Sequence, residues 1–266
     1  MSVLARMWLA GHRNLLALHK LLHGVMGGIG LGVLTRKDLH AISERAYSGI
    51  ATYQTDDYNR SGLSPWEESA IRTHFDGCER ILVAAAGGGR EVLALRRRGL
   101  EVDGFEANPT LVAYANELLE REGGGEPIRL APWDGCPEYE SRYDGAIVGW
   151  GAYMHIRGRN RRVAFLRQLR ERVSTGSPLL LSCMGVDRYT RWMRLTAAIG
   201  SALATVTRRE RVELGDSMEP DYKHFFTRDE LRREMVQAGF ELATFSSGPI
   251  GAAVGIAVDP GRNREG

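Results

Sequence analysis

Three consecutive glycines, Gly87 to Gly89, stand directly after an apolar run and directly before two charged residues. Glycines at such a turn remove side chains, so the backbone can lie close to a bound ligand. Glu106, which ends the next predicted strand, lies 19 residues beyond Gly87. A carboxylate at this position can accept hydrogen bonds from both hydroxyls of a ribose. This spacing predicts a site for a nucleotide-like ligand.

A strand, a turn and a helix must hold these residues, and the surrounding sequence predicts that unit. Residues 80–86 form a short apolar run, which is typical of a buried strand. Residues 91–98 have a helical pattern that ends in three arginines followed by Gly99, a typical helix C-terminus. Residues 101–106 are the second predicted strand. The glycines therefore connect a strand to a helix.

The same alternation continues along the chain. Asn108 and Pro109 predict the start of a helix that runs to about residue 120. Three more strands are predicted over residues 127–131, 145–149 and 178–182, and the apolar face of a further helix comprises Val163, Leu166, Leu169 and Val173. Repeated strand–helix units predict an α/β fold, a doubly wound, Rossmann-like and mostly parallel sheet with helices on both faces.

The end of the chain predicts a different pairing of strands. Thr227 and Glu230 form a capping-box pattern, and Gly239 ends the helix that they begin. Two strands follow over residues 240–245 and 252–258. So short a connection joins antiparallel strands, because a parallel crossover needs about a dozen residues or more. We therefore expect a C-terminal antiparallel strand pair.

Residues 1–77 are expected to be helical and to form a lid or substrate segment, ahead of a cofactor-binding domain over residues 78–266. Ser64, Pro65 and Glu67 predict a helix start within this segment.

The apolar stretch 15–34 contains His19, Lys20, His23 and five glycines, and fits neither a spanning helix nor a signal peptide. We predict a helix that packs on the body, with a helix on a membrane surface as the alternative. His19 and His23 have no third ligand beside them, and no metal site is predicted.

Residues 186–224 form a long insertion, which we expect to be a cap beside an acceptor pocket. Its apolar part, residues 195–206, indicates either a partly hydrophobic acceptor or a subunit interface of a homodimer. The sequence leaves both alternatives open.

Composition restricts the function classes. Lys plus Arg number 35 and Asp plus Glu number 33, so no overall basic charge favours nucleic-acid binding. The basic cluster 157–162 is interpreted as a solvated helix start. Cys78, Cys136 and Cys183 are odd in number and widely spaced, which favours a reducing, cytoplasmic location and no disulfide framework.

Four motifs together resemble a known family: ILVAAAGGGREVLAL, VDGFEANP, YDGAIVGWGAYMHI and HFFTRDELRREMVQAGFEL. Over about residues 79–258, the chain resembles class I S-adenosylmethionine-dependent methyltransferases. The terminal antiparallel pair separates this family from most dinucleotide-binding sheets.

The resemblance implies S-adenosylmethionine as cofactor and S-adenosylhomocysteine as product. The glycine turn would contact the methionine part, Glu106 the ribose, and residues 133–134 the adenine, while residues 149–150 would face the sulfonium. The implied cofactor site comprises Ala85, Ala86, Gly87, Gly88, Gly89, Glu106, Ala107, Asn108, Trp133, Asp134, Gly149 and Trp150.

Two positions depart from the family pattern. Val83 stands where members usually carry an acid, and Ala85 stands where they usually carry the first glycine. A group from the N-terminal helices is expected to compensate for them at the amino end of the cofactor. The candidate substrate-binding residues are Tyr53, Tyr58, Asn59, Trp66 and Tyr153, and the alternative is that these side chains are packing residues.

Methyl transfer needs a general base only if the acceptor must lose a proton early. His155, which follows the fourth strand, is the first candidate catalytic residue, and His224 is the second. The alternative for each is an ordinary hydrogen-bonded histidine.

We therefore predict direct methyl transfer to a small-molecule acceptor. One alternative is an NAD-dependent oxidoreductase, although Val92 stands where the third glycine of that motif belongs. The other alternative is a non-catalytic cofactor-binding protein that associates with a membrane.

Overall fold

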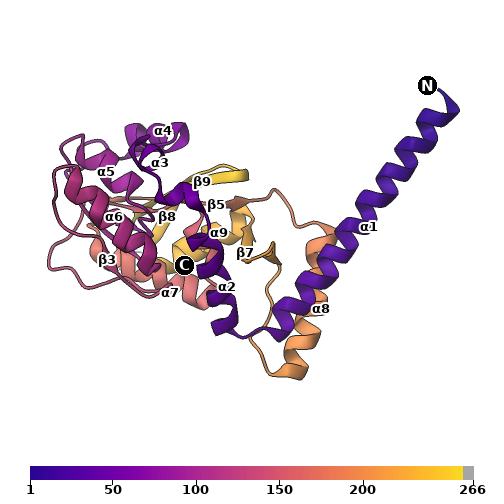
Figure 1. The fold of residues 1–266 in the computed structure, drawn as a ribbon. Helices are drawn as coiled ribbons and strands as arrows, with labels where there is room; N and C mark the ends of the chain where they lie inside the picture. Colours follow the sequence, from indigo (N-terminus) through magenta and orange to yellow (C-terminus); the bar gives the residue numbers. More distant parts are fainter. Residues whose placement is uncertain (260–266) are drawn as a thin grey trace.

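The computed structural model describes residues 1–259, except for the side chains of Pro249 and Ile250. One mixed sheet with helices on both faces forms the body of the molecule (Figure 1). Parallel strands lie in the order β3-β2-β1-β4-β5, and β7 (Tyr222–Phe226) pairs parallel with the end of β5. Their bounds are β1 (Arg80–Ala84), β2 (Glu101–Glu106), β3 (Arg129–Leu130), β4 (Gly145–Val148) and β5 (Pro178–Gly185). The predicted α/β fold class is confirmed.

Alternate residues of each strand point to opposite faces of the sheet, so each strand contributes to two apolar cores. In β1, Ile81 and Val83 belong to the core under α4, α5 and α6, whereas Leu82 and Ala84 belong to the core under α7 and α9. These helices are α4 (Pro65–His74), α5 (Arg90–Arg96), α6 (Pro109–Arg121), α7 (Arg159–Arg172) and α9 (Arg228–Ala238). Full burial on both faces explains why β1 is a continuous apolar run.

The sheet ends in the predicted antiparallel pair. The strands β8 (Phe240–Phe245) and β9 (Gly248–Ala257) are antiparallel to each other, and β9 also runs antiparallel to β5.

Residues 1–77 are largely helical, as predicted. Ahead of α4 they form α1 (Val3–Val33), α2 (Arg36–Ser48), the 3₁₀ helix η1 (Ala51–Gln54) and α3 (Asp56–Arg60). At the start of α4, the backbone N–H of Ser64 donates to the Glu67 carboxylate, which confirms the predicted capping box. The division into domains at residue 77 stays a prediction.

The insertion differs from the predicted cap in its contents and its place. Its apolar part lies in the helix α8 (Arg191–Thr207), and a hairpin of β6 (Asp216–Met218) and β7 (Tyr222–Phe226) follows. The helix α8 packs along α1 beside the body (Figure 1). Small residues of α8 pack against glycines of α1, so each helix buries part of the other's surface.

The N-terminal helix α1 packs only through its last third. Its buried residues are Gly24, Gly27, Gly28, Leu31 and Gly32, and the rest of the helix extends away from the sheet (Figure 1). The expectation of a helix that packs on the body therefore holds only for that last third. By length and composition alone, α1 is the one helix among residues 1–259 that could cross a membrane.

Small residues repeat every four positions on both sides of the α1–α8 contact. Gly24, Gly28 and Gly32 of α1 face Thr196, Gly200 and Ala204 of α8. The Thr196 hydroxyl donates to the carbonyl of Gly24 over 3.1 Å, and the Thr207 hydroxyl donates to that of Gly32 over 2.6 Å. Small residues let the backbones approach closely enough for such bonds.

Replacing Gly32 with alanine is expected to lower the free energy of unfolding by about 1–3 kcal/mol, since overpacking a close contact costs this much. A Cβ atom there would lie 2.6 Å from Cβ of Leu203 and 2.7 Å from the carbonyl oxygen of Gly200. Gly11 is a matched control in the same helix because a Cβ there meets nothing within 4 Å. Gly11→Ala is expected to stabilise the chain by about 0.5–1 kcal/mol. Urea denaturation measures both changes, and equal effects would contradict the close packing.

Candidate functional site

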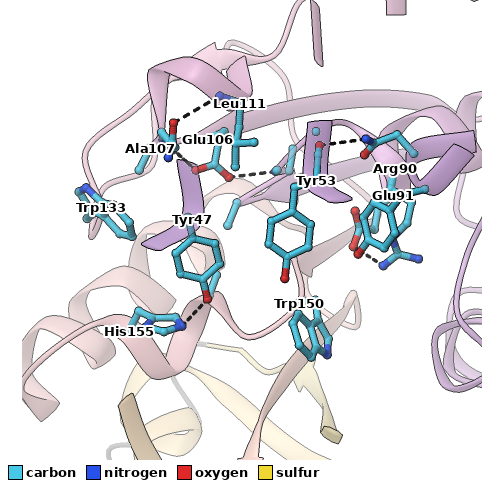
Figure 2. Close-up of a pocket in the computed structure, with 18 residues that line it drawn as sticks. Tyr47, Tyr53, Arg90, Glu91, Glu106, Ala107, Leu111, Trp133, Trp150 and His155 are labelled. Carbon is cyan, nitrogen blue, oxygen red and sulfur yellow. Dashed lines mark hydrogen bonds and ion pairs between the residues drawn. The ribbon is translucent and has the colours of Figure 1, made fainter. Parts of the chain in front are cut away.

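One pocket lies where the carboxyl ends of β1, β2 and β4 meet the segment from α2 to α3 (Figure 2). Its space, including the open mouth, is about 760 Å³. The lining residues are Tyr47, Tyr53, Tyr58, Asn59, Ala85, Ala86, Gly87, Gly88, Arg90, Glu91, Glu106, Ala107, Asn108, Leu111, Trp133, Trp150, Ala152 and His155.

The glycine turn is enclosed between two other backbone segments. A Cβ atom on Gly88 would lie 2.3 Å from the carbonyl oxygen of Tyr53, so only glycine lets the N-terminal segment lie on the turn. A Cβ atom on Gly149 would lie 2.1 Å from the carbonyl oxygen of Ala85. Ala85 has a φ of 53°, in the left-handed region that favours glycine. Alanine thus adopts here the backbone conformation that glycine favours.

Glu106 ends β2 with its carboxylate in the pocket (Figure 2). One oxygen accepts from the backbone N–H of Gly87 over 2.9 Å, and the other accepts from Ala107 and Asn108 over 2.7 and 2.8 Å. Burial raises the pKa of Glu106, and these three backbone hydrogen bonds oppose the rise. The carboxylate is thus held rigidly, with further acceptor capacity for ligand hydroxyls.

Aromatic side chains form the side of the pocket opposite the turn. The rings of Tyr47 and Tyr53 stack at 6.0 Å between centroids, and Tyr58 lies against Tyr53 at 5.5 Å. Trp133 and Trp150 also line the pocket. Tyr47 was not predicted from the sequence, because it lies in an otherwise polar helix with no motif around it.

A buried charge cluster closes one end of the pocket and was also missed. Arg90 makes two hydrogen bonds to Glu67, over 2.7 and 2.8 Å, and a third to Glu91 over 2.6 Å. Burial raises the pKa of Glu91 to about 7, although the positive charge of Arg90 opposes the rise. The sequence features that could have indicated this cluster are the charged pair directly after the glycines, Arg90 and Glu91, and the capping-box residue Glu67.

Asn59 has an unused acceptor at the pocket wall. Its side-chain N–H groups donate to the carbonyl oxygens of Tyr53 and Thr55 over 3.0 and 2.9 Å. Its Oδ1 atom is buried and has no hydrogen-bond partner. A buried acceptor without a partner is costly, so a ligand that donates a hydrogen bond here would be favoured.

His155, at the end of the 3₁₀ helix η2 (Ala152–His155), reaches the pocket through Tyr47 (Figure 2). Its Nε2 atom lies 2.6 Å from the Tyr47 hydroxyl, and its Nδ1 atom lies 2.7 Å from the carbonyl oxygen of Tyr222. A carbonyl only accepts, so Nδ1 carries the proton and Nε2 accepts from Tyr47. Burial lowers the pKa of His155, while Asp221 opposes the change. A neutral histidine is thus poised to take a proton through Tyr47.

Three predicted cofactor residues do not line the pocket. Gly89 caps α5 in the left-handed conformation, and Gly149 makes room for Ala85 without reaching the cavity. The carboxylate of Asp134 does not line the pocket and pairs with Arg36 over 2.9 Å. The other nine predicted cofactor residues line the pocket.

Two predicted substrate residues are packing residues instead. Trp66 packs against the core beneath α4, and Tyr153 is fully buried with its hydroxyl donating to Glu234 over 2.6 Å. Tyr53, Tyr58 and Asn59 do line the pocket.

His224, the second candidate catalytic residue, does not line the pocket. Its side chain is fully buried in a charge network away from the pocket, where Nδ1 lies 2.7 Å from Asp216 and Nε2 lies 3.0 Å from Glu230. The Glu213 carboxylate lies within 4.8 Å of the Asp216 carboxylate and the His224 ring, a spacing that could hold a metal ion. Arg162 pairs with Glu213 over 2.9 Å and balances its charge. The group is therefore a compensated ion-pair network, with both nitrogens of His224 already bonded.

This network predicts a pH dependence of stability. Burial and the charge of Arg162 lower the pKa of His224, but hydrogen bonds to Asp216 and Glu230 outweigh them and raise it to about 9. A folded-state pKa above the unfolded value of ~6.5 gives stabilisation that is complete below about pH 6.5 and is lost as pH rises through about 9. We expect urea denaturation between pH 6 and 10 to show this decline. His224→Gln, which does not titrate, should remove it, and an unchanged pH profile in this variant would contradict the assignment.

No family model matches the sequence, and a search of curated proteins found no match. The structure is similar to solved structures of methyltransferases. These include a SAM-dependent methyltransferase from Methanosarcina mazei (17% identity, TM-score 0.58, covering 74% of this chain and 99% of that one). They also include the CcbJ methyltransferase from Streptomyces caelestis (16% identity, TM-score 0.56, covering 78% and 98%).

A third similar structure is the 1,6-didemethyltoxoflavin-N1-methyltransferase of Burkholderia thailandensis, solved with 1,6-didemethyltoxoflavin and S-adenosylhomocysteine (15% identity, TM-score 0.57, covering 85% and 92%). At these identities the likeness concerns the fold. With its strand order, its terminal antiparallel pair and its pocket at the carboxyl ends of the strands, the chain has the fold of the class I S-adenosylmethionine-dependent methyltransferases.

Proposed function

We propose that the chain transfers a methyl group from S-adenosylmethionine to a small-molecule acceptor. The observation that carries this proposal is one pocket that combines the glycine turn, the rigid Glu106 carboxylate and an aromatic wall. The similar Burkholderia enzyme was solved with bound 1,6-didemethyltoxoflavin and S-adenosylhomocysteine, which supports this class of acceptor.

The lining residues fit each part of the cofactor. Glu106 would accept from the ribose hydroxyls, Trp133 would contact the adenine, and the turn at residues 85–88 would lie along the methionine part. The aromatic faces of Tyr47 and Trp150 would favour the positive sulfonium.

Two groups would replace the acid that is missing at Val83. Asn59 offers its unpaired Oδ1, and Glu91 offers a carboxylate that lines the same pocket. Both would accept hydrogen bonds from the ammonium group of the methionine part, so this end of the cofactor is held by residues from α3 and α5.

The reaction would be a direct displacement, for which the protein supplies alignment and the exclusion of water. An acceptor N–H or O–H placed against Tyr47 would pass its proton to that hydroxyl as Tyr47 passes its own to His155. Asp221, whose carboxylate lies 3.5 Å from Nδ1, would stabilise the protonated imidazole.

Replacing Tyr47 with phenylalanine keeps the stacked ring and removes only the hydroxyl. We expect unchanged binding of S-adenosylhomocysteine and a methyl-transfer rate lower by about 10²-fold, the lower range for general acid–base catalysis. Calorimetry and the rate of S-adenosylhomocysteine formation measure the two effects. A full transfer rate in this variant would exclude the proton route.

A thermal-shift measurement tests the proposed function. Stabilisation by S-adenosylhomocysteine and not by NAD is expected, since a ligand that binds only the folded state raises its stability. The reverse result would favour the oxidoreductase alternative. Failure to form S-adenosylhomocysteine with any of a broad set of small acceptors would favour the non-catalytic alternative. Cytoplasmic location, a homodimer and the absence of a nucleic-acid partner stay predictions.

A further inference from the structure

One face of α1 exposes an apolar stripe along the whole helix. From Leu15 onward the side chains of the stripe recur every three or four residues, and Leu4, Met7 and Trp8 continue the same face one heptad before them; each side chain is between 40% and 78% exposed. Residues at this spacing share one face of a helix. The stripe comprises Leu4, Met7, Trp8, Leu15, Leu18, Leu22, Met26, Ile29 and Val33. So many exposed apolar side chains on one face indicate a binding surface.

The body of the protein does not cover this stripe. The contact with α8 uses the glycines at positions 24, 28 and 32 on another side of α1, and the N-terminal part of the helix extends away from the sheet (Figure 1). The close packing against α8 holds the projecting helix in a defined direction. The stripe is therefore available to an external partner.

The charge around the stripe indicates the chemistry of that partner. Residues 1–37 contain five cations and no acidic residue; the cations are Arg6, Arg13, Lys20, Arg36 and Lys37. The first three recur every seven residues, which places them on the side of α1 opposite the stripe. A helix with an apolar face and a cationic polar face is typical of helices that lie on a membrane surface. Since no acidic residue accompanies these three cations within residues 1–37, an anionic surface would attract them.

Spanning a bilayer fits the helix less well than lying on one. Arg6, Arg13 and Lys20 are spread through its length, and such a residue at the membrane centre costs about 2.5–3.5 kcal/mol. In a helix that lies at the interface, long cationic side chains reach the headgroups while the apolar face enters the acyl boundary.

We propose that α1 docks the protein on anionic lipid bilayers, with the stripe in the acyl boundary and the cations at the headgroups. The pocket then works beside a membrane surface. This proposal does not depend on the methyltransferase activity.

Vesicle flotation of the full chain tests the proposal. We expect binding to vesicles of phosphatidylcholine and phosphatidylserine, and much weaker binding to phosphatidylcholine alone. Leu15→Gln with Leu22→Gln changes two stripe residues and should weaken binding on the order of tenfold per side chain. Leu9→Gln with Leu16→Gln is the matched control, since it makes the same change off the stripe in the same helix and should have little effect.

A second comparison tests the cations. Replacing Arg6, Arg13 and Lys20 with glutamine should weaken binding about fivefold per residue, which corresponds to ~1 kcal/mol each. Circular dichroism and the melting temperature verify that all variants are folded. Failure of the full chain to float with anionic vesicles would overturn the proposal. So would stripe variants that float normally while a dimer dissociates in sedimentation, because the stripe would then join two copies.

Discussion

Replacing Glu106 with alanine is expected to weaken the binding of S-adenosylhomocysteine by about 5- to 150-fold, or ~1–3 kcal/mol, the effect of losing a buried charged acceptor. The carboxylate is 8% exposed and is held by the N–H groups of Gly87, Ala107 and Asn108. The variant loses the contact to the ribose hydroxyls and also the link between the glycine turn and the end of β2. Isothermal titration calorimetry measures the change in affinity.

Glu101→Ala is the matched control because the same strand begins with this residue, where the side chain is 77% exposed. We expect it to leave the affinity unchanged. If Glu106→Ala also binds S-adenosylhomocysteine with unchanged affinity, the ribose lies elsewhere in the pocket. That result would not contradict the methyltransferase activity itself.

Replacing Arg90 with methionine is expected to lower the free energy of unfolding by about 3–5 kcal/mol, because it leaves buried carboxylates without their cation. The Arg90 and Glu67 side chains are only 6% and 2% exposed, and Glu91 depends on the same guanidinium. The loss should shrink at acidic pH, since protonated carboxyl groups need no cation. Urea denaturation at two pH values measures both expectations.

A second ion pair between the same parts of the chain is the control for Arg90. Arg98, just after α5, pairs with Glu68 of α4, next in sequence to Glu67, but these side chains are 39% and 44% exposed. Arg98→Met is therefore expected to cost about 0–1 kcal/mol, as exposed pairs do. Similar losses in the two variants would show that the Arg90 cluster is hydrated rather than buried.

The cofactor half of the site was largely predictable, because local patterns specify it. An apolar strand, a glycine turn and a carboxylate at the end of the next strand place the turn near Glu106 in any parallel sheet of this kind. The terminal antiparallel pair followed from the length of one connection. The strand, the turn and the short connection are each specified by residues that are neighbours in the sequence.

The other half of the pocket was decided by contacts between distant segments. Tyr47 reaches His155 from α2, and Asn59 meets Gly88 from α3, although no spacing in the sequence connects either pair. His224 and Tyr153 carry the same chemical groups as site residues, yet the fold buries both among carboxylates. Residue type alone does not distinguish a catalytic histidine from one in an ion-pair network.

By itself the sequence determined the sheet, the turn and the carboxylate at the end of β2, because strand and helix periodicity and turn chemistry are local. Only the tertiary structure decided what surrounds them: the aromatic wall, the buried Arg90 cluster and the pairing of α1 with α8. The glycines at positions 24, 28 and 32 of α1 show the difference. In the sequence they argue against a spanning helix, and in the fold they are the surface on which α8 packs, which leaves the apolar stripe exposed.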